Sequence, residues 1–190
     1  MMKLSYRVMT VALALSGAFN AVAAPSTWSG NGHQYEIILA PSTSWSAART
    51  SALSLGSGWD LATITSMDEQ NFITSLIGPS QNTLVEYYIG GTYASGNWGW
   101  VTNEAFSFTY WGSGEPNGNQ SEPYIALDGR MNVPNWGWND YTGAGSSFIA
   151  GYVVEQHAAP VPEPETYAMM LAGLGLLGVF AKRRKQKAVA

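Results

Sequence analysis

The sequence predicts an α+β domain in which two early helices are followed by short strands and long loops. Residues 44–55 carry apolar side chains at spacings of three and four, which is typical of an amphipathic helix. A second helix is expected over residues 66–77, because Ser66 and Glu69 form a capping box and a Gly-Pro pair follows. Beyond it, the apolar runs are short and aromatic, and glycines separate them, as in a sheet with long connections.

Short apolar runs on both sides of the helices have the composition of β-strands. The expected strands cover residues 34–39, 59–64, 87–91, 98–101, 124–127 and 151–155. The chain contains no cysteine, so the fold must be disulfide-free, and zinc–thiolate sites and cysteine nucleophiles are excluded.

Charge is distributed unevenly along the chain. All thirteen acidic residues lie between residues 25 and 165, where Arg49 and Arg130 are the only bases. Such an acidic surface repels a phosphate backbone, so no nucleic-acid partner is expected. It suits a protein that depends on a cation.

The first 23 residues are typical of a secretory signal peptide. Lys3 and Arg7 precede a short apolar run, and the small residues at positions 21–23 suit cleavage. The folded domain is therefore expected over residues 24–157.

The C-terminal residues indicate a second sorting signal. Residues 158–165 read as a Pro-rich acidic linker, and residues 166–190 contain a short apolar transmembrane helix with a basic tail. This combination resembles the PEP-CTERM signal of Gram-negative bacteria. The resemblance implies an inner-membrane-anchored intermediate, processing by an exosortase-type membrane enzyme, and export to the cell surface or extracellular matrix. An ordinary C-terminal anchor is the alternative, and it would leave the domain facing the periplasm.

Two oxygen-rich clusters lie in the second half of the domain. The first contains Glu115 and Asn117 with Glu122 behind them, and the second is Asn139-Asp140. Carboxylates and amide carbonyls are hard oxygen ligands, and Ca²⁺ binds about 6–8 of them. The clusters therefore predict a calcium site if the fold brings them together, whereas each one alone has the composition of a surface turn.

The order of these segments resembles that of a C-type lectin-like domain. The resemblance covers most of residues 33–156 and depends most on two tripeptides, Glu115-Pro116-Asn117 and Trp138-Asn139-Asp140. It implies two helices, small antiparallel sheets and a long loop region. Tyr124 and Val154 stand where the family's half-cystines are expected. The other matching segments are residues 58–62, 88–91, 98–101, Trp111 with Gly114, and the closing strand at 151–155.

The resemblance also implies a role for the oxygen clusters. It implies a cis bond before Pro116, which proline makes accessible. The Glu-Pro-Asn order accompanies mannose- or glucose-type sugars in the family, whereas galactose-type members carry Gln-Pro-Asp. Trp136 is a further candidate, because its ring could stack on a sugar face. The implied ligands of a single Ca²⁺ ion and of the sugar bound to it are Glu115, Asn117, Glu122, Asn139 and Asp140.

The expected function is calcium-dependent binding of a glycan or exopolysaccharide at the bacterial envelope or in its matrix. A lectin-like scaffold that binds no sugar, and serves protein contacts or matrix structure, is the alternative. Enzymatic activity is not expected, because His33 and His157, the only histidines, lie at the edges of the domain without a nucleophile motif. Glu115 and Glu122 would be the pair for glycoside hydrolysis, but their grouping with amides favours a metal site.

Overall fold

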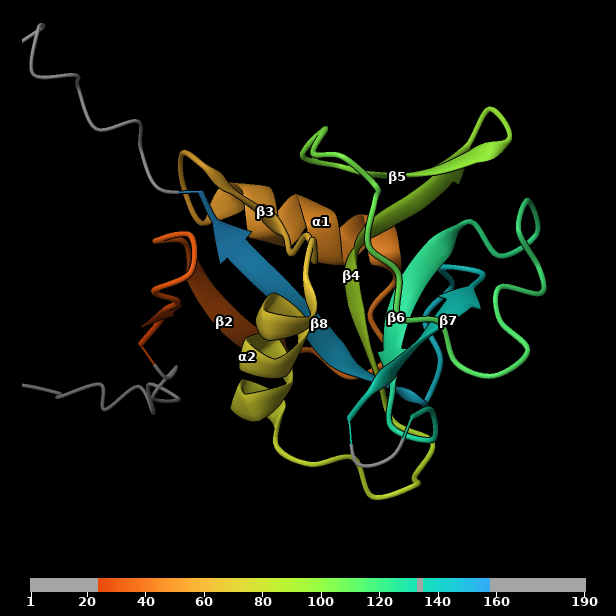
Figure 1. Cartoon of the computed structure of the whole chain (residues 1–190). Helices are drawn as coiled ribbons and strands as arrows, with labels where there is room; N and C mark the ends of the chain where they lie inside the picture. The colour runs from red at the N-terminus through yellow and green to blue at the C-terminus, as the bar shows by residue number, and fades with distance from the viewer. Residues whose placement is uncertain (1–23, 133–134, 158–190) are drawn as a thin grey trace, which may run out of the picture.

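The computed structural model describes residues 24–132 and 135–157 of the chain. The domain has two helices, as predicted, and one mixed sheet (Figure 1). In chain order the elements are β1 (Ser26–Thr27), β2 (Gln34–Leu39), α1 (Trp45–Ser54), β3 (Trp59–Leu61), α2 (Met67–Ile77), β4 (Glu86–Ala94), β5 (Asn97–Trp100), β6 (Tyr124–Asp128), β7 (Gly137–Tyr141) and β8 (Ile149–Gln156).

Both helices begin at the serines that the sequence indicates. The Ser44 hydroxyl accepts a hydrogen bond from the Ala47 N–H, and the Ser66 hydroxyl accepts one from the Glu69 N–H at 3.2 Å. The second half of the capping box differs from the expectation. The Glu69 carboxylate accepts from the Thr65 N–H at 2.7 Å rather than from the cap residue itself. Glu69 thereby holds the residue before α2 in place as well as the first turn.

The sheet is a single connected unit rather than a set of small antiparallel sheets. Its main strand order is β1-β2-β8-β4-β6-β7, with β3 added to β8 and β5 added to β4. The β4–β8 pair is parallel, and the other strand pairs are antiparallel. The chain therefore closes by returning its last strand to the middle of the sheet, between β2 and β4 (Figure 1).

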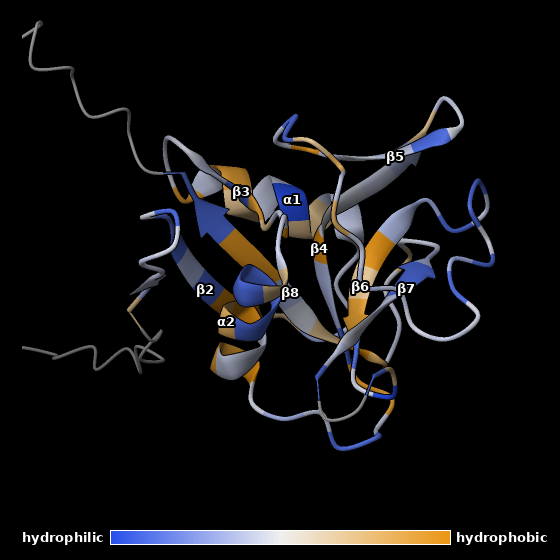
Figure 2. Cartoon of the chain, in the orientation of Figure 1, coloured by the Kyte–Doolittle hydropathy of each residue, from blue (hydrophilic) through white to orange (hydrophobic). Residues whose placement is uncertain are grey.

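The two faces of the sheet are covered by two hydrophobic cores. Successive residues of a strand point to opposite faces, so Val153 enters one core and Val154 the other. Helix α2 packs in the first core together with the long connection between β5 and β6, and α1 packs in the second. Figure 2 shows apolar residues concentrated along β6 and β8, between polar loops.

An aromatic contact joins α1 to β6 near one of the expected half-cystine positions. The Tyr124 ring stacks on the Trp45 ring with the centroids 4.3 Å apart. The Trp45 Nε1 also donates to the Ile89 carbonyl at 2.9 Å. Val154, at the other half-cystine position, is fully buried in the same core. The helix is thus attached to the sheet by packing, by this hydrogen bond and by the ion pair of Arg49 with Asp60 on β3.

Several expectations concern residues outside the described ranges. These are the signal peptide at residues 1–23, the linker at 158–165, and the transmembrane helix with its basic tail at 166–190. Among the helices of residues 24–132 and 135–157, none has the length and apolar character needed to cross a bilayer.

Candidate functional site

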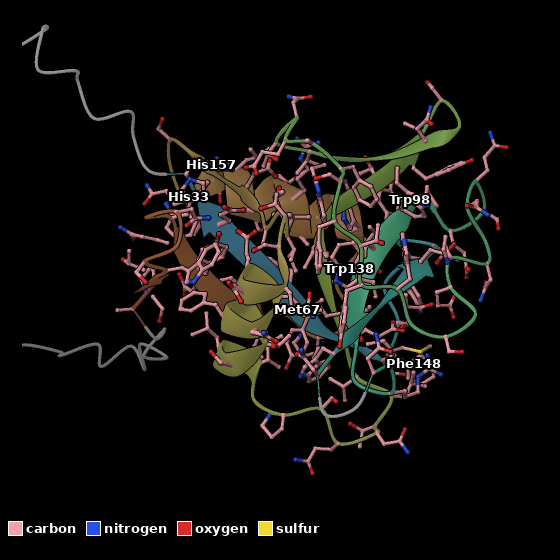
Figure 3. The ribbon with its side chains drawn as sticks, in the orientation of Figure 1. His33, Met67, Trp98, Trp138, Phe148 and His157 are labelled. Carbon is pink, nitrogen blue, oxygen red and sulfur yellow. The ribbon has the colours of Figure 1, made fainter. Side chains whose placement is uncertain are left out.

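The first oxygen cluster lies on a long loop that aromatic packing fixes to the sheet. The Trp111 ring lies 4.9 Å from Trp98 and 5.7 Å from Trp138, centroid to centroid. The backbone around it bonds to β7, because the Gly112 N–H donates to the Trp138 carbonyl at 2.8 Å. Figure 3 labels Trp98 and Trp138, on which this part of the loop rests. The loop therefore reaches residue 115 directly beside the strand that carries the second cluster.

The Glu115–Pro116 peptide bond is cis, in agreement with the prediction. It stands at the head of a tight segment in which the Glu115 N–H donates to the Gly112 carbonyl at 3.1 Å. The segment after the proline turns over the end of β7.

Asp140 is the residue that fastens this segment to the sheet. It lies on β7 and is almost fully buried. Its carboxylate accepts three backbone hydrogen bonds, from the N–H groups of Asn117, Gly118 and Asn119 at 2.9, 2.8 and 2.7 Å. Hydrogen bonds to a charged acceptor contribute about 1.5–3 kcal/mol each. The two oxygen clusters therefore do meet, and Asp140 is where they meet.

Glu115 and Glu122 complete a group of three carboxylates. Burial, followed by the hydrogen bond to Asp140 and the charges of Asp140 and Glu122, raises the pKa of Glu115 to about 7. Burial and the Asp140 charge also raise the pKa of Glu122. The Glu122 side chain lies against Gly118, where a Cβ atom would overlap its carboxylate. Among the described residues, no base forms a salt bridge with these three carboxylates, and the nearby Arg130 pairs with Asp128 instead.

Asn139 points away from this group. Its Nδ2 donates to the Glu86 Oε1 at 3.1 Å, on the side of β7 opposite to Asp140. Glu86 is buried beside Asp128, and Arg130 bonds to Asp128 and lies 3.8 Å from Glu86. Burial and the Asp128 charge raise the pKa of Glu86 to about 7. The sequence offers no signal for this group, because only the β4–β6 register pairs Glu86 with Asp128.

Trp136 is not part of the site surface in this structure. Its ring is 5% exposed and packs edge-to-face on Tyr87. Its Nε1 donates to the Gly78 carbonyl at 2.7 Å. The ring therefore joins α2 to the core and presents no free face to a ligand.

The donor set fits a hard cation. One carboxylate oxygen of Glu115, Oε2, is buried without a hydrogen-bond partner. Glu122 and Asp140 lie beside it, and the exposed Asn117 follows on the same loop. A buried carboxylate among like charges is costly unless a cation or donor compensates it. All of these donors are oxygen atoms, which Ca²⁺ prefers.

Comparisons with known proteins identify a sorting motif near the C-terminus and lectin-like relatives of the folded domain. Residues 160–185 match the PEP-CTERM protein-sorting motif. Mouse C-type lectin domain family 4 member A is 30% identical over 123 residues, which are 61% of this chain and 48% of that protein. The chain spans about half the length of the curated relatives it matches.

Solved structures give the same result. The C-type lectin domain of murine dendritic cell inhibitory receptor 2, in complex with an N-glycan, is 29% identical with a TM-score of 0.54, covering 66% of this chain and 91% of that one. A herring type II antifreeze protein is 22% identical with a TM-score of 0.56, covering 72% and 98%. The chain therefore combines a C-type lectin-like domain with a PEP-CTERM sorting motif.

Proposed function

We propose that the chain is an exported, calcium-dependent carbohydrate-binding protein of the bacterial envelope or extracellular matrix. The observation that carries this proposal is the convergence of Glu115, Glu122 and Asp140 around a cis-proline loop, with Glu115 Oε2 buried and unpaired. The glycan-bound murine domain among the similar structures supports the same class of ligand.

The proposed ion would be held by the predicted ligands, and it would bind sugar hydroxyls directly. Glu115, Glu122 and Asp140 supply charge that matches a divalent cation, and Asn117 supplies an amide oxygen. Asn139 joins the set only if its amide turns from Glu86 towards the loop. Only an ion that includes Asn139 among its ligands would have to break the Asn139–Glu86 hydrogen bond.

The proposed sugar is of the mannose or glucose type. This rests on the Glu115-Pro116-Asn117 order, in which a carboxylate and an amide flank the proline and offer an acceptor and a donor to two adjacent hydroxyls. The natural partner would then be a glycan or exopolysaccharide that displays such hydroxyls.

The sorting motif supports export through an exosortase-type system. We infer an intermediate anchored in the inner membrane by the C-terminal helix, followed by release to the cell surface or matrix. A cell-fractionation experiment tests this inference. Deletion of residues 160–185 should leave the domain out of the surface and matrix fractions, and unchanged delivery would contradict it.

A scaffold that binds no sugar is the second candidate, and one observation favours it. Asp140 already accepts hydrogen bonds from three backbone N–H groups, and the Asn139 amide is held by Glu86. The loop is thus fixed without a cation. An antifreeze protein among the similar structures shows that the fold also serves other purposes.

Calorimetry of the purified chain distinguishes the two candidates. We expect Ca²⁺ to bind with one ion per chain, and mannose to bind only when Ca²⁺ is present. The Glu115→Gln variant should lose both signals, whereas Asp68→Asn, which changes an exposed carboxylate on α2, should keep both. Absence of Ca²⁺ binding would favour the scaffold. Stronger binding of galactose than of mannose would contradict the sugar assignment, and unchanged sugar binding in Asn139→Ala would exclude that residue from the site.

A further inference from the structure

Both histidines of the chain meet at one end of the sheet (Figure 3). In the β2–β8 ladder Tyr35 pairs with Glu155. His33 directly precedes β2 and His157 directly follows β8, so the same register places the two imidazoles opposite each other. Their ring centroids are 4.6 Å apart. Because residues two apart share a face of a strand, these four side chains all point to the same side.

The Glu155 carboxylate lies beside the two rings. Its Oε1 is 2.5 Å from the His33 Nδ1. One ligand atom from each of His33, Glu155 and His157 lies within 4.8 Å of the others. Donors in a tetrahedral zinc site bind at about 2.0–2.2 Å from the metal. Three donors this close need only small side-chain rotations to reach one ion, which would replace the proton shared by His33 and Glu155.

The Glu155 carboxylate is held in position by hydrogen bonds to residues other than the histidines. Glu155 is 1% exposed. Its Oε2 accepts from the Thr63 N–H at 2.8 Å, and its Oε1 accepts from the Tyr35 hydroxyl at 3.0 Å. Partners of this kind orient a metal-binding carboxylate and are a regular feature of metal sites.

The second imidazole is oriented in a similar way. The His157 Nδ1 lies 3.5 Å from the Glu104 Oε1, while its Nε2 is buried and has no hydrogen-bond partner. A carboxylate on one ring nitrogen leaves the other nitrogen as the ligand atom, as in many histidine–metal sites. His157 therefore offers one unpaired nitrogen with an outer partner in place.

We propose that His33, Glu155 and His157 bind a divalent transition-metal ion of the zinc class. Two imidazole nitrogens and one carboxylate are the donors that zinc prefers, whereas calcium prefers oxygen alone. The His33 and His157 side chains are 18% and 32% exposed, so the ion has access from solvent. Beside His157 lies a shallow depression of about 250 Å³, lined by Gly58, Trp59, Asp60 and Thr102.

The ion would join the beginning of β2 to the end of β8. Its site ends at His157, just before the sorting motif that starts at residue 160. Bound zinc would therefore stabilise the part of the sheet from which the sorting segment departs. The connection between β5 and β6, which carries Glu115, lies on the other side of the domain in Figures 1 and 3, so the two ions are expected to bind independently.

Zinc titration of the full chain, purified without a histidine tag, tests the proposal. In competition with a chromophoric chelator, one zinc ion should bind with a Kd of about 1 μM or tighter. His33→Ala and His157→Ala should each weaken binding at least about 100-fold, and Glu104→Gln about tenfold, as for an outer partner. Asp68→Asn, which changes an exposed carboxylate on α2 that belongs to neither site, is the matched control and should leave the zinc affinity unchanged.

A second readout separates metal binding from folding. Co²⁺ in place of zinc should give visible absorption typical of a low-coordinate nitrogen and oxygen site, and His157→Ala should abolish it while its circular dichroism stays native. The absence of stoichiometric zinc binding by the folded wild-type chain would overturn the proposal. Equal zinc affinity in the wild type and both histidine variants would also overturn it. Neither result depends on calcium or sugar binding.

Discussion

The carboxylate site and the histidine site are built from the same fold in opposite ways. The carboxylate site consists of a long loop laid over β7, and its key atoms are crowded oxygens that form no salt bridge with a described base. The histidine site is the continuation of a strand ladder, and its central carboxylate is fully hydrogen-bonded. The comparison shows that donor type and degree of pairing, rather than the presence of acids, distinguish a proposed calcium site from a proposed zinc site.

The two sites also differ in what holds them together before an ion binds. The Asp140 carboxylate accepts from the backbone N–H groups of three successive residues, so the tip of the loop at residues 117–119 depends mainly on one side chain. The histidines depend on the register of β2 and β8, which many backbone hydrogen bonds define. Loss of the Asp140 carboxylate should therefore destabilise the loop at residues 117–119. A single substitution near the histidine site should leave the β2–β8 pairing largely intact.

The largest effect is expected for Asp140→Ala. This change leaves three backbone donors without their acceptor, so we expect the free energy of unfolding of the ion-free chain to fall by about 3 kcal/mol. Urea denaturation measures it. Asp68→Ala, at an exposed position, is the control and should stay within about 0.5 kcal/mol of wild type. Zinc affinity of the folded variant should be unchanged, and a parallel loss would show that the two regions are coupled.

The next largest effect concerns stabilisation by each ion. An ion present at 100 times its Kd raises the free energy of unfolding by about 2.7 kcal/mol. Calcium should therefore raise the melting temperature of the wild type and of His157→Ala, but not of Glu115→Gln. Zinc should do so for Glu115→Gln but not for His157→Ala. If one variant lost the rise in melting temperature with both calcium and zinc, the two sites would not be independent.

A smaller difference is expected within the carboxylate site itself. Glu115 has a buried unpaired oxygen, whereas Glu122 is less buried and lies at the edge of the loop. We expect Glu122→Gln to lower calcium affinity about tenfold, or about 1.4 kcal/mol, and Glu115→Gln to lower it more. Calorimetric titrations of both variants check the order. The reverse order would place Glu122 at the centre of the ion's ligands.

The smallest effect is on the pH dependence of stability without calcium. Glu115 has a folded-state pKa of about 7, above its ordinary value of 4.5, so its contribution is fully present below about pH 4.5 and is lost as the pH rises through 7. Glu115→Gln should flatten the decline in stability between pH 5 and 8. With calcium bound the sign reverses, because protons compete with the ion. Urea denaturation at both pH values, with a chelator and with calcium, measures the two slopes.

Local patterns in the sequence predict the parts of this fold that depend on near neighbours. Ser44 and Ser66 identify both helix starts. That the two oxygen clusters meet is implied only by the resemblance to a lectin-like domain, because Asn117 and Asp140 lie 23 positions apart in the chain. Strand partners cannot be deduced in this way. The parallel β4–β8 pair and the Glu86–Asp128 contact depend on register between segments far apart in the chain.

The histidine cluster illustrates the same limit. His33 and His157 stand at the two edges of the domain in sequence, and that separation makes them look unrelated. Only the β2–β8 register shows that the beginning and the end of the domain lie side by side in the sheet. Trp136 shows the converse, because its place beside the second tripeptide suggests the site while its ring belongs to the core.

The stacking of Tyr124 on Trp45 has a consequence for how the domain matures after export. The packing of these two rings attaches α1 to β6 without a disulfide. Because the chain has no cysteine, folding includes no thiol oxidation and requires neither an oxidant nor a disulfide isomerase. Folding can therefore proceed in a compartment of any redox potential. Once folded, the chain has no disulfide bond that a reductant could break.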